Sequence, residues 1–282
     1  MHPSLDEIVS RVDDLPALPQ VVAKVLQLTD DPNSTVKELS EVICQDQVLT
    51  AKVLRLANSA YYGYPRRIGT IVEAIVMLGF KAIRNLVMAA SVQKILYQSV
   101  AGYRLEAGDL WRHSIACAMA AHKVAKRVGY NKSDEAFIAG LLHDIGKVVL
   151  NVYVNEAYGE IVKRVKDLHV SFSQAEKDVI GFTHADVGAR VVDKWNLPKQ
   201  YVEAIAYHHE PELGKENPRL VAIVHLADVM CMMMGIGLGG DGLYYAVSSE
   251  AFSVLGLRSL DVENILEELG DLFIDTDAFD PI

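Results

Sequence analysis

The sequence predicts an all-α protein. Apolar residues recur at helical rather than alternating spacing along almost the whole chain, and we find no convincing pair of alternating strands. Helix starts are marked by a threonine followed three residues later by an acidic residue: Thr35 with Glu38, Thr70 with Glu73, and Thr183 with Asp186. Prolines fall between or at the starts of these helices, where a missing amide does no harm: Pro16, Pro19, Pro32 and Pro65.

The chain is expected to form two helical parts. Gln98–Asp109, "QSVAGYRLEAGD", contains two glycines and has no apolar periodicity, so it is predicted to be a linker. This divides the chain into an N-terminal helical subdomain, residues 1–100, and a longer helical bundle, residues 101–282. No internal repeat or low-complexity tract is present.

Composition narrows the class of protein. A chain of 282 residues that is 51% hydrophobic is predicted to be globular, and its acidic first residues do not resemble a signal peptide. Because Val229–Gly240, a window without charges near the C-terminus, is too short to cross a bilayer, no membrane span is expected and a cytoplasmic location follows. The formal net charge of -10 makes nucleic acid an unfavourable partner.

Histidines and carboxylates form a pattern in the second half of the chain. Five helical segments each contribute, with every residue on or at the end of a predicted helix, and the candidate metal ligands are His113, His143, Asp144, His184, His208, His209 and Asp228. Helical bundles build metal centres in this way, from side chains that project inward from facing helices. Seven candidates are too many for one tetrahedral zinc, so the pattern favours a centre of two divalent ions.

The segment "LLHDIGKVVL", Leu141–Leu150, contains the centre of this pattern and is predicted to be a buried helix. His143 and Asp144 are adjacent, so their side chains would point about 100° apart and could hold one ion or two neighbouring ions. Lys147 lies one turn further on, where its ammonium could meet a phosphate oxygen or could simply be solvated at a helix end. Gly140 and Gly146 are expected to let neighbouring helices come close.

These residues allow a mechanistic hypothesis. Two divalent ions would outweigh the charges of Asp144 and Asp228, so the pocket would be locally positive and would attract phosphate. Asp144 is the candidate to bridge the ions and orient a water molecule, and Lys147 is the candidate to stabilise charge on the phosphoryl oxygens. Asp144 and Lys147 are therefore the predicted catalytic residues.

The chain also resembles a known family. His113, His143–Asp144 and Asp228 are similar in order to the HD superfamily of metal-dependent phosphohydrolases, and His184, His208 and His209 resemble the fuller ligand set of its HD-GYP branch. In the N-terminal part, "LPALP", "ICQDQVLTAKVLRLANSAYYG" and "IGTIVEAIVMLGF" are similar to recurring segments of the HDOD branch. Together the resemblance covers nearly the whole chain and identifies it as an HDOD protein.

The two branches imply different functions. HD-GYP proteins hydrolyse a cyclic dinucleotide, but the segment "HHEPELGKENPRL" lacks their Gly-Tyr-Pro motif, so the resemblance to that branch is limited to the ligands. An HD-GYP-like acidic ligand one turn before the first histidine would correspond here to Asp109. The resemblance implies iron or manganese as the ions, with zinc, nickel or magnesium as alternatives.

Two functional hypotheses therefore stand. One is a metal-dependent phosphohydrolase that acts on a phosphomonoester or phosphodiester, including nucleotides. The other is a non-catalytic signalling adaptor that contacts a protein partner and has a structural or ligand-sensing metal site. Whether the protein is an enzyme stays open at this level.

Three further features have simpler interpretations. His225, one turn before Asp228, could line the pocket, but it is better interpreted as a supporting or core histidine. "GIGLGG", Gly235–Gly240, matches a dinucleotide-binding pattern without the required strand, so it is expected to be a flexible loop. The three cysteines, Cys44, Cys117 and Cys231, are predicted to be small buried hydrophobic residues.

Overall fold

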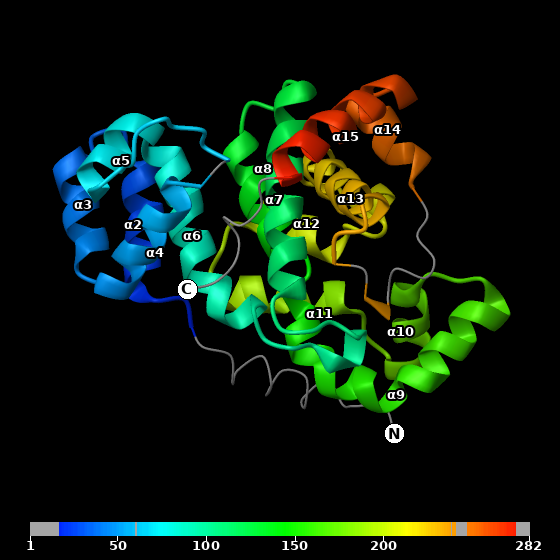
Figure 1. The fold of residues 1–282 in the computed structure, drawn as a ribbon. Helices are drawn as coiled ribbons and strands as arrows, with labels where there is room; N and C mark the ends of the chain where they lie inside the picture. Colours follow the sequence, from blue (N-terminus) through cyan, green and yellow to red (C-terminus); the bar gives the residue numbers. More distant parts are fainter. Residues whose placement is uncertain (1–16, 60, 238, 241–246, 275–282) are drawn as a thin grey trace. The chain divides into compact units, whose positions relative to one another are not determined.

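The structure, a computed structural model, describes residues 17–59, 61–237, 239–240 and 247–274. Within that part of the chain every regular element is a helix, and the single β-bridge, between Val100 and Leu105, is isolated (Figure 1). The predicted all-α class is confirmed. Contacts divide the described residues into two compact units, one formed by Ala17–Lys94 with residues 270–274, the other by Ile95–Leu269.

The first unit contains short helices, coloured blue to cyan in Figure 1. Apolar faces of α2, α3 and α5 pack together around side chains such as Val22, Val25, Leu39, Ile43 and Ile75, all of which are buried. The helices are α2 (Gln20–Asp30), α3 (Val36–Cys44), α4 (Gln47–Ala57), α5 (Ile71–Leu78) and the greater part of α6 (Phe80–Leu96).

The predicted helix starts are confirmed. Thr35 and Glu38 form a capping box at α3, and the Thr70 hydroxyl accepts the amide of Glu73 at α5. Thr183 and Asp186 form a second capping box at α11 (His184–Lys194). Each such cap stabilises its helix by about 1 kcal/mol. Thr183 therefore also fixes the start of a helix whose first residue is His184. Pro19, Pro32 and Pro65 lie outside the helices as expected, whereas Pro16 lies outside the described residues.

The second unit contains the longer helices. Here α7 packs along α8 and α13, while α9 packs against α10 and α11, and α11 against α12. The elements are η1 (Ala101–Tyr103), α7 (Asp109–Arg127), α8 (Ser133–Leu142), α9 (Gly146–Leu168), α10 (Phe172–Ile180), α11, α12 (Lys199–Ala206), η2 (Pro211–Leu213), α13 (Pro218–Met233), α14 (Ser249–Leu255) and the greater part of α15 (Ser259–Ile274).

The segment Gln98–Asp109 connects α6 to α7, but it is packed rather than free. The short helix η1 lies on α9, where the Gly102 amide donates to Asn151 Oδ1 (2.8 Å). A Cβ at Gly102 would lie 2.3 Å from the Asn151 carbonyl oxygen, so only glycine permits this approach. The Tyr103 side chain is fully buried. The sequence pattern showed the break between helices but not its packing.

The predicted single helix over Leu141–Leu150 is interrupted. Helix α8 ends at Leu142, and His143, Asp144 and Ile145 form a turn before α9 begins at Gly146. The turn lets the two side chains of His143 and Asp144 enter the interior from a helix end. The expected role of the glycines is confirmed: a Cβ at Gly140 would lie 2.7 Å from the Cys117 carbonyl oxygen of α7, and one at Gly146 would lie 1.9 Å from that of His184.

One helical stretch of the described chain, Ser133–Leu168, is long and apolar enough to cross a membrane by length and composition alone. Of the most apolar 18-residue segment of this stretch, 78% is buried inside the protein. A core helix of a folded domain meets the same criteria, and this stretch contains the buried polar residues His143, Asp144 and Lys147.

Candidate metal centre

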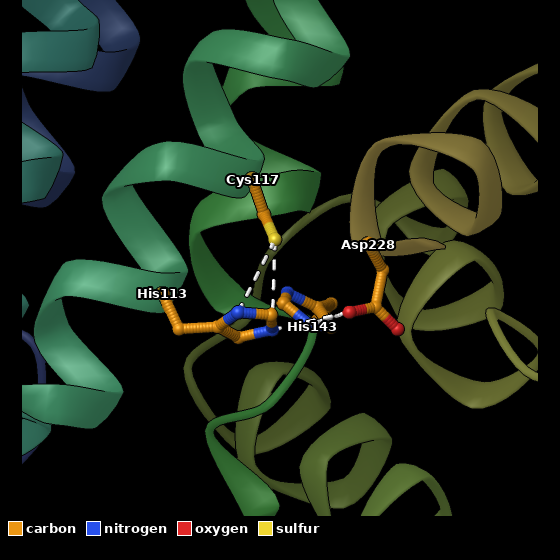
Figure 2. A group of neighbouring side chains, drawn as sticks. All are labelled: His113, Cys117, His143 and Asp228. Carbon is orange, nitrogen blue, oxygen red and sulfur yellow. Dashed lines mark hydrogen bonds and ion pairs between the residues drawn. The ribbon is translucent and has the colours of Figure 1, made fainter. Parts of the chain in front are cut away.

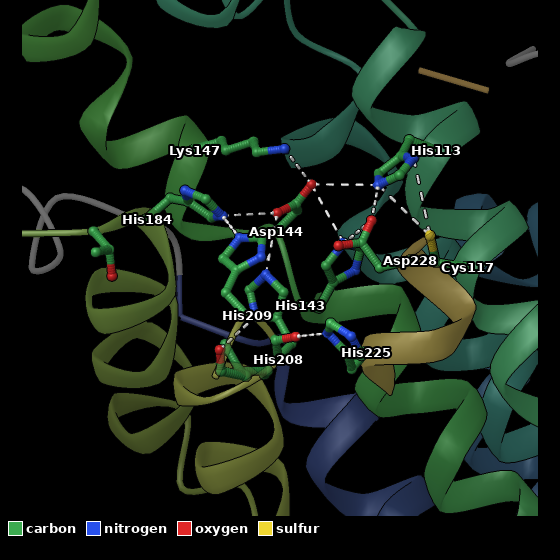
Figure 3. Close-up of polar contacts among 12 residues, drawn as sticks. His113, Cys117, His143, Asp144, Lys147, His184, His208, His209, His225 and Asp228 are labelled. Atoms are coloured by element: carbon green, nitrogen blue, oxygen red, sulfur yellow. Dashed lines mark hydrogen bonds and ion pairs between the residues drawn. The ribbon is translucent and has the colours of Figure 1, made fainter. Parts of the chain in front are cut away.

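The seven predicted ligands converge in the interior of the second unit (Figure 3). They come from separate elements that helix packing brings together. His113 lies on α7, Asp228 on α13, and His143 and Asp144 in the turn between α8 and α9. His184 is the first residue of α11, and His208 and His209 follow the end of α12. All are buried except His209, which is half-buried.

One half of the centre combines imidazoles with a carboxylate. The Nε2 atom of His113 lies 3.1 Å from Asp228 Oδ1, and the Nε2 atom of His143 lies 3.7 Å from the same oxygen. We call His113, His143 and Asp228 the histidine–aspartate group. The distances are those of ligands that could share one ion.

The other half consists of imidazoles alone. His184, His208 and His209 each present a ring nitrogen within 4.8 Å of the others, and we call them the three-histidine group. The Nε2 atoms of His184 and His209 are only 2.7 Å apart. Two nitrogen lone pairs do not approach so closely unless a proton or a cation lies between them.

Asp144 lies between the two groups. Its Oδ2 atom is 3.5 Å from His113 Nε2 and 3.4 Å from His143 Nε2. Its Oδ1 atom is 3.4 Å from His184 Nε2 and 3.9 Å from His208 Nε2. Because each oxygen faces a different group, this carboxylate has the placement expected of a bridge between two ions.

Hydrogen bonds fix the orientation of the rings. The Nδ1–H of His143 donates to the Gly140 carbonyl (2.8 Å), and that of His208 donates to the Ile205 carbonyl (2.7 Å). His113 donates in the same way to the Ile236 carbonyl (3.0 Å). Metal-binding histidines typically have this second hydrogen bond, which leaves Nε2 directed at the ion.

A carboxylate performs this role for His184. Its Nδ1–H donates to Glu176 Oε2 (2.7 Å), and the same oxygen accepts the His184 backbone amide (3.1 Å). The other Glu176 oxygen accepts the hydroxyl of Tyr103. Glu176 is completely buried and accepts a hydrogen bond from each of these three donors. The ring of His184 is thereby held in one orientation.

Three buried polar atoms of the centre indicate whether its residues fit bound ions. Among the described residues, His143 Nε2, Asp144 Oδ1 and His208 Nε2 have no hydrogen-bond partner. Buried polar atoms without a partner are rare because each costs about 1–3 kcal/mol. All three point into the centre, and nitrogen and oxygen donors of this kind suit divalent transition metals. The residues therefore fit two divalent ions.

Electrostatic coupling within the centre is strong. Burial alone would lower the pKa of His143, but the carboxylates of Asp144 and Asp228 raise it to about 10. Burial would also lower the pKa of His184, but the carboxylates of Glu176 and Asp144 raise it above its ordinary value. In the metal-free chain protons therefore occupy positions among these carboxylates that a dication would also favour.

The neighbouring imidazoles shift in the opposite direction. Burial, and then the positive charge of His143 and His184, lower the pKa of His208 to about 3. Burial and the adjacent His208 also place the pKa of His209 well below its ordinary value. Both rings are neutral at physiological pH, which is the form that binds a metal.

Lys147 is buried against Asp144. Its Nζ atom forms an ion pair with Asp144 Oδ2 (2.5 Å) and lies 5.6 Å from the centroid of the Tyr103 ring. In spite of burial, the positive charges of His143 and Lys147 hold the pKa of Asp144 well below its ordinary value. The lysine thus lies at the centre but is engaged by the predicted bridging carboxylate.

The two additional candidates lie in different surroundings. His225 donates from Nδ1 to the His208 carbonyl (2.7 Å), and its Nε2 accepts the Ser248 amide (3.0 Å). With both nitrogens engaged, it supports the backbone of His208, in agreement with the interpretation as a supporting residue. Asp109 accepts the Glu106 amide (2.8 Å) at the start of α7 and lies 3.9 Å from Arg112, so both of its oxygens have partners outside the seven ligands.

Two contributing side chains were not predicted. Glu176 occupies a core position of α10, four residues from both buried Phe172 and buried Ile180. A charged residue at an apolar position of a helix was the sequence feature that could have indicated its role. Cys117 lies one turn beyond His113 and belongs to a four-residue cluster with His113, His143 and Asp228.

The prediction of three buried cysteines is correct for Cys117 and Cys231 but wrong for Cys44, which is exposed at the end of α3.

The glycine-rich loop also contributes. Its Ile236 carbonyl accepts a hydrogen bond from the ring of His113. A Cβ at Gly237 would lie 2.5 Å from the His113 Cβ. Gly237 has a φ of 70°, which favours glycine. The described part of "GIGLGG" is a loop, as expected, and it packs on His113.

Comparison with known proteins assigns the family. Residues 15–211, well over half of the chain, match the HDOD domain. The chain belongs to the HDOD family. The resemblance seen in "LPALP" and the two longer N-terminal segments is thus confirmed.

Solved structures agree with an HDOD fold. The chain is similar to an HDOD domain protein of unknown function from Geobacter sulfurreducens, with 29% identity and a TM-score of 0.78, covering 95% of this chain and 93% of that chain. It is also similar to a candidate phosphohydrolase from Shewanella amazonensis SB2B, with 27% identity and a TM-score of 0.73, covering 97% and 96%.

Curated relatives are longer than this HDOD chain. An uncharacterised protein of Treponema pallidum (strain Nichols) is 28% identical over 265 residues, which cover 89% of this chain and 48% of that protein. Ribonuclease Y of Lawsonia intracellularis is 32% identical over 122 residues, which cover 43% of this chain and 18% of that protein. The chain therefore spans about half, or less, of the length of these relatives.

Proposed function

We propose that this HDOD protein is a metal-dependent phosphohydrolase with two divalent ions. The observation that carries the proposal is the position of Asp144, whose two oxygens face separate groups of inward-directed imidazoles. Iron or manganese ions are preferred for this donor set, with zinc, nickel or magnesium as alternatives. Bound there, the ions would supply positive charge for a phosphoryl group and would acidify a water molecule.

The residues of the chain have distinct roles in this proposal. Asp144 would bridge the two groups and orient the attacking water, because it is the carboxylate within reach of both. Lys147 would exchange part of its ion pair with Asp144 for a phosphoryl oxygen of the substrate. Glu176 would keep the Nε2 atom of His184 directed inward during the reaction.

The substrate class is proposed from the names of two similar proteins. The similar structure from Shewanella amazonensis is named as a candidate phosphohydrolase, and the partial relative from Lawsonia intracellularis is named a ribonuclease. Both names concern the cleavage of phosphate esters, so we place phosphodiesters, including nucleotides, first among substrates and phosphomonoesters second. The adaptor hypothesis predicts ion binding without hydrolysis of either.

The test begins with protein purified without chelators. We expect elemental analysis to give about two ions per chain, and iron- or manganese-loaded protein to hydrolyse at least one of four substrates: bis-p-nitrophenyl phosphate, p-nitrophenyl phosphate, a cyclic dinucleotide and an RNA oligonucleotide. Asp144→Asn should reduce turnover at least about 100-fold and lower the metal content, since a ligand shared by both groups is lost.

Asp193→Asn is the matched control. Asp193 is an exposed carboxylate paired with Lys199 on the surface, so the same change there should alter neither metal content nor turnover. Protein that holds two ions yet hydrolyses none of the four substrates would contradict the enzymatic proposal and favour the adaptor. Equal turnover by Asp144→Asn and the wild type would remove Asp144 from the mechanism.

A further inference from the structure

Cys117 lies directly beside the histidine–aspartate group. It follows His113 by one turn of α7, and its side chain is completely buried (Figure 2). The Sγ atom is 3.6 Å from His113 Nε2. The potential ligand atoms of Cys117, His113, His143 and Asp228 all lie within 4.8 Å of one another. The thiol is therefore within the space that an ion bound by the other three would occupy.

A second observation points to a ligand at the same place. His143 Nε2 is buried and has no hydrogen-bond partner among the described residues, and it is directed into this four-residue cluster. Its Nδ1 atom is already committed to the Gly140 carbonyl, so the ring cannot turn to satisfy Nε2 without losing that bond. A cation among the four side chains would satisfy it.

The distances agree with those between neighbouring ligands of one ion. At ligand–metal–ligand angles of about 110°, metal–sulfur bonds of about 2.3 Å and metal–nitrogen bonds of about 2.0–2.1 Å give an S–N distance of about 3.6 Å and N–O distances of about 3.4 Å. The observed Cys117 Sγ to His113 Nε2 distance is 3.6 Å. The two N–O distances to Asp228 Oδ1 are 3.1 and 3.7 Å, on either side of the expected distance.

We infer that Cys117 is a further ligand, beside the bridging Asp144, of the ion held by the histidine–aspartate group. On binding, the thiol proton leaves to solvent as the sulfur–metal bond forms. The inference rests on the proposed metal centre and extends it, because the three-histidine group contains no sulfur. The two ion positions then differ in kind: the Cys117 position favours a thiophilic ion such as zinc or iron(II), and the other suits ions that prefer nitrogen and oxygen.

The test uses cobalt(II) as a spectroscopic probe in the full chain. Thiolate ligation of cobalt(II) produces a charge-transfer band in the near ultraviolet, which imidazole and carboxylate ligands do not produce. We expect wild-type protein titrated with cobalt(II) to develop this band as one of its two sites fills. Cys117→Ser should abolish the band and weaken binding at that site at least about tenfold, leaving the other site unchanged.

Cys231→Ser is the matched control. Cys231 is also buried, and its thiol lies next to that of Cys117, but it is outside the four-residue cluster. This variant should retain both the band and the affinity. Cys117→Ala provides a second test that introduces no hydroxyl, and thermal unfolding of each metal-free variant separates misfolding from ligand loss.

The possible results distinguish the two proposals. Two bound cobalt ions without the charge-transfer band would overturn the role of Cys117, leaving it as a hydrogen-bond donor to His113, while the metal centre itself would stand. A band that persists in Cys117→Ser would also overturn it. No cobalt binding by the wild type would overturn both the inference and the proposed function.

Discussion

The two halves of the candidate centre share Asp144 but are constructed differently. In the histidine–aspartate group, His113 and Asp228 project from the interiors of two long packed helices, α7 and α13. In the three-histidine group, every residue lies at a helix end: His184 starts α11, and His208 and His209 follow α12.

The difference shows how position on a helix determines the support that a ligand needs. Helix interiors fix the backbone by packing, so His113 needs only a loop carbonyl, that of Ile236, to orient its ring. A helix end is less constrained, and His184 has both a capping box and the buried Glu176 to hold it. We therefore expect perturbations outside the ligands to affect one half at a time.

The largest effect is expected from Glu176→Gln. The amide retains the size of the side chain but cannot accept all three hydrogen bonds of Glu176, so His184 loses orientation and basicity. We expect affinity for one of the two ions to fall on the order of 10–100-fold, and calorimetric titration with manganese measures it.

Tyr103→Phe serves as the comparison for Glu176→Gln. It removes the other hydrogen bond of Glu176 but leaves the contact with His184. It should destabilise the fold while retaining both ions. Equal loss of both ions in Glu176→Gln would show that the halves are not independent.

A smaller loss of affinity, in the other half of the centre, is expected from Gly237→Ala. Its Cβ would lie 2.5 Å from that of His113, so the loop or the ring must move. The histidine–aspartate group should lose about tenfold in affinity, because the hydrogen bond from His113 to the Ile236 carbonyl is disturbed. The three-histidine group should retain its ion.

Gly256→Ala controls for backbone strain. Gly256 has a φ of 65°, close to the 70° of Gly237, but no atom lies within 4 Å of its would-be Cβ. Both variants should lose about 1 kcal/mol of stability from the left-handed backbone. If Gly256→Ala also lost metal, general destabilisation would explain the result for Gly237.

The smallest effect concerns a histidine that belongs to neither half. His122, on α7, is half-buried with its ring 6.5 Å from that of Phe137. Burial, reinforced by Lys126, lowers its pKa from 6.5 to about 4. Between these pH values the unfolded chain binds more protons, so stability falls as pH falls.

His122→Gln should remove this contribution, about 1–2 kcal/mol, from the pH dependence of unfolding. Denaturant unfolding of the metal-free protein and the variant at pH 4.5 and 7 measures the difference. Metal content should be unchanged. A variant with the same pH slope as the wild type would show that folding does not lower the pKa of His122.

Much of the centre could be predicted from residue type and local spacing. Caps such as Thr183 with Asp186 depend on neighbours in sequence, and His143 and Asp144 stand out because charges are expensive in an apolar segment. The supporting contacts could not be predicted in this way. His113 meets Ile236 from 123 residues away, and Tyr103 meets Glu176 from 73 residues away, so both depend on how the helices pack.

The crossing of α9 and α11 has a final consequence. Gly146 approaches so closely that its would-be Cβ lies 1.9 Å from the His184 carbonyl oxygen, and Gly188 of α11 lies at the same crossing. Main chain rather than flexible side chains therefore fixes the distance from Asp144 to His184. The centre is preorganised, so ion binding need not spend free energy on assembling it. We therefore expect ion binding to leave the backbone at this crossing almost unchanged.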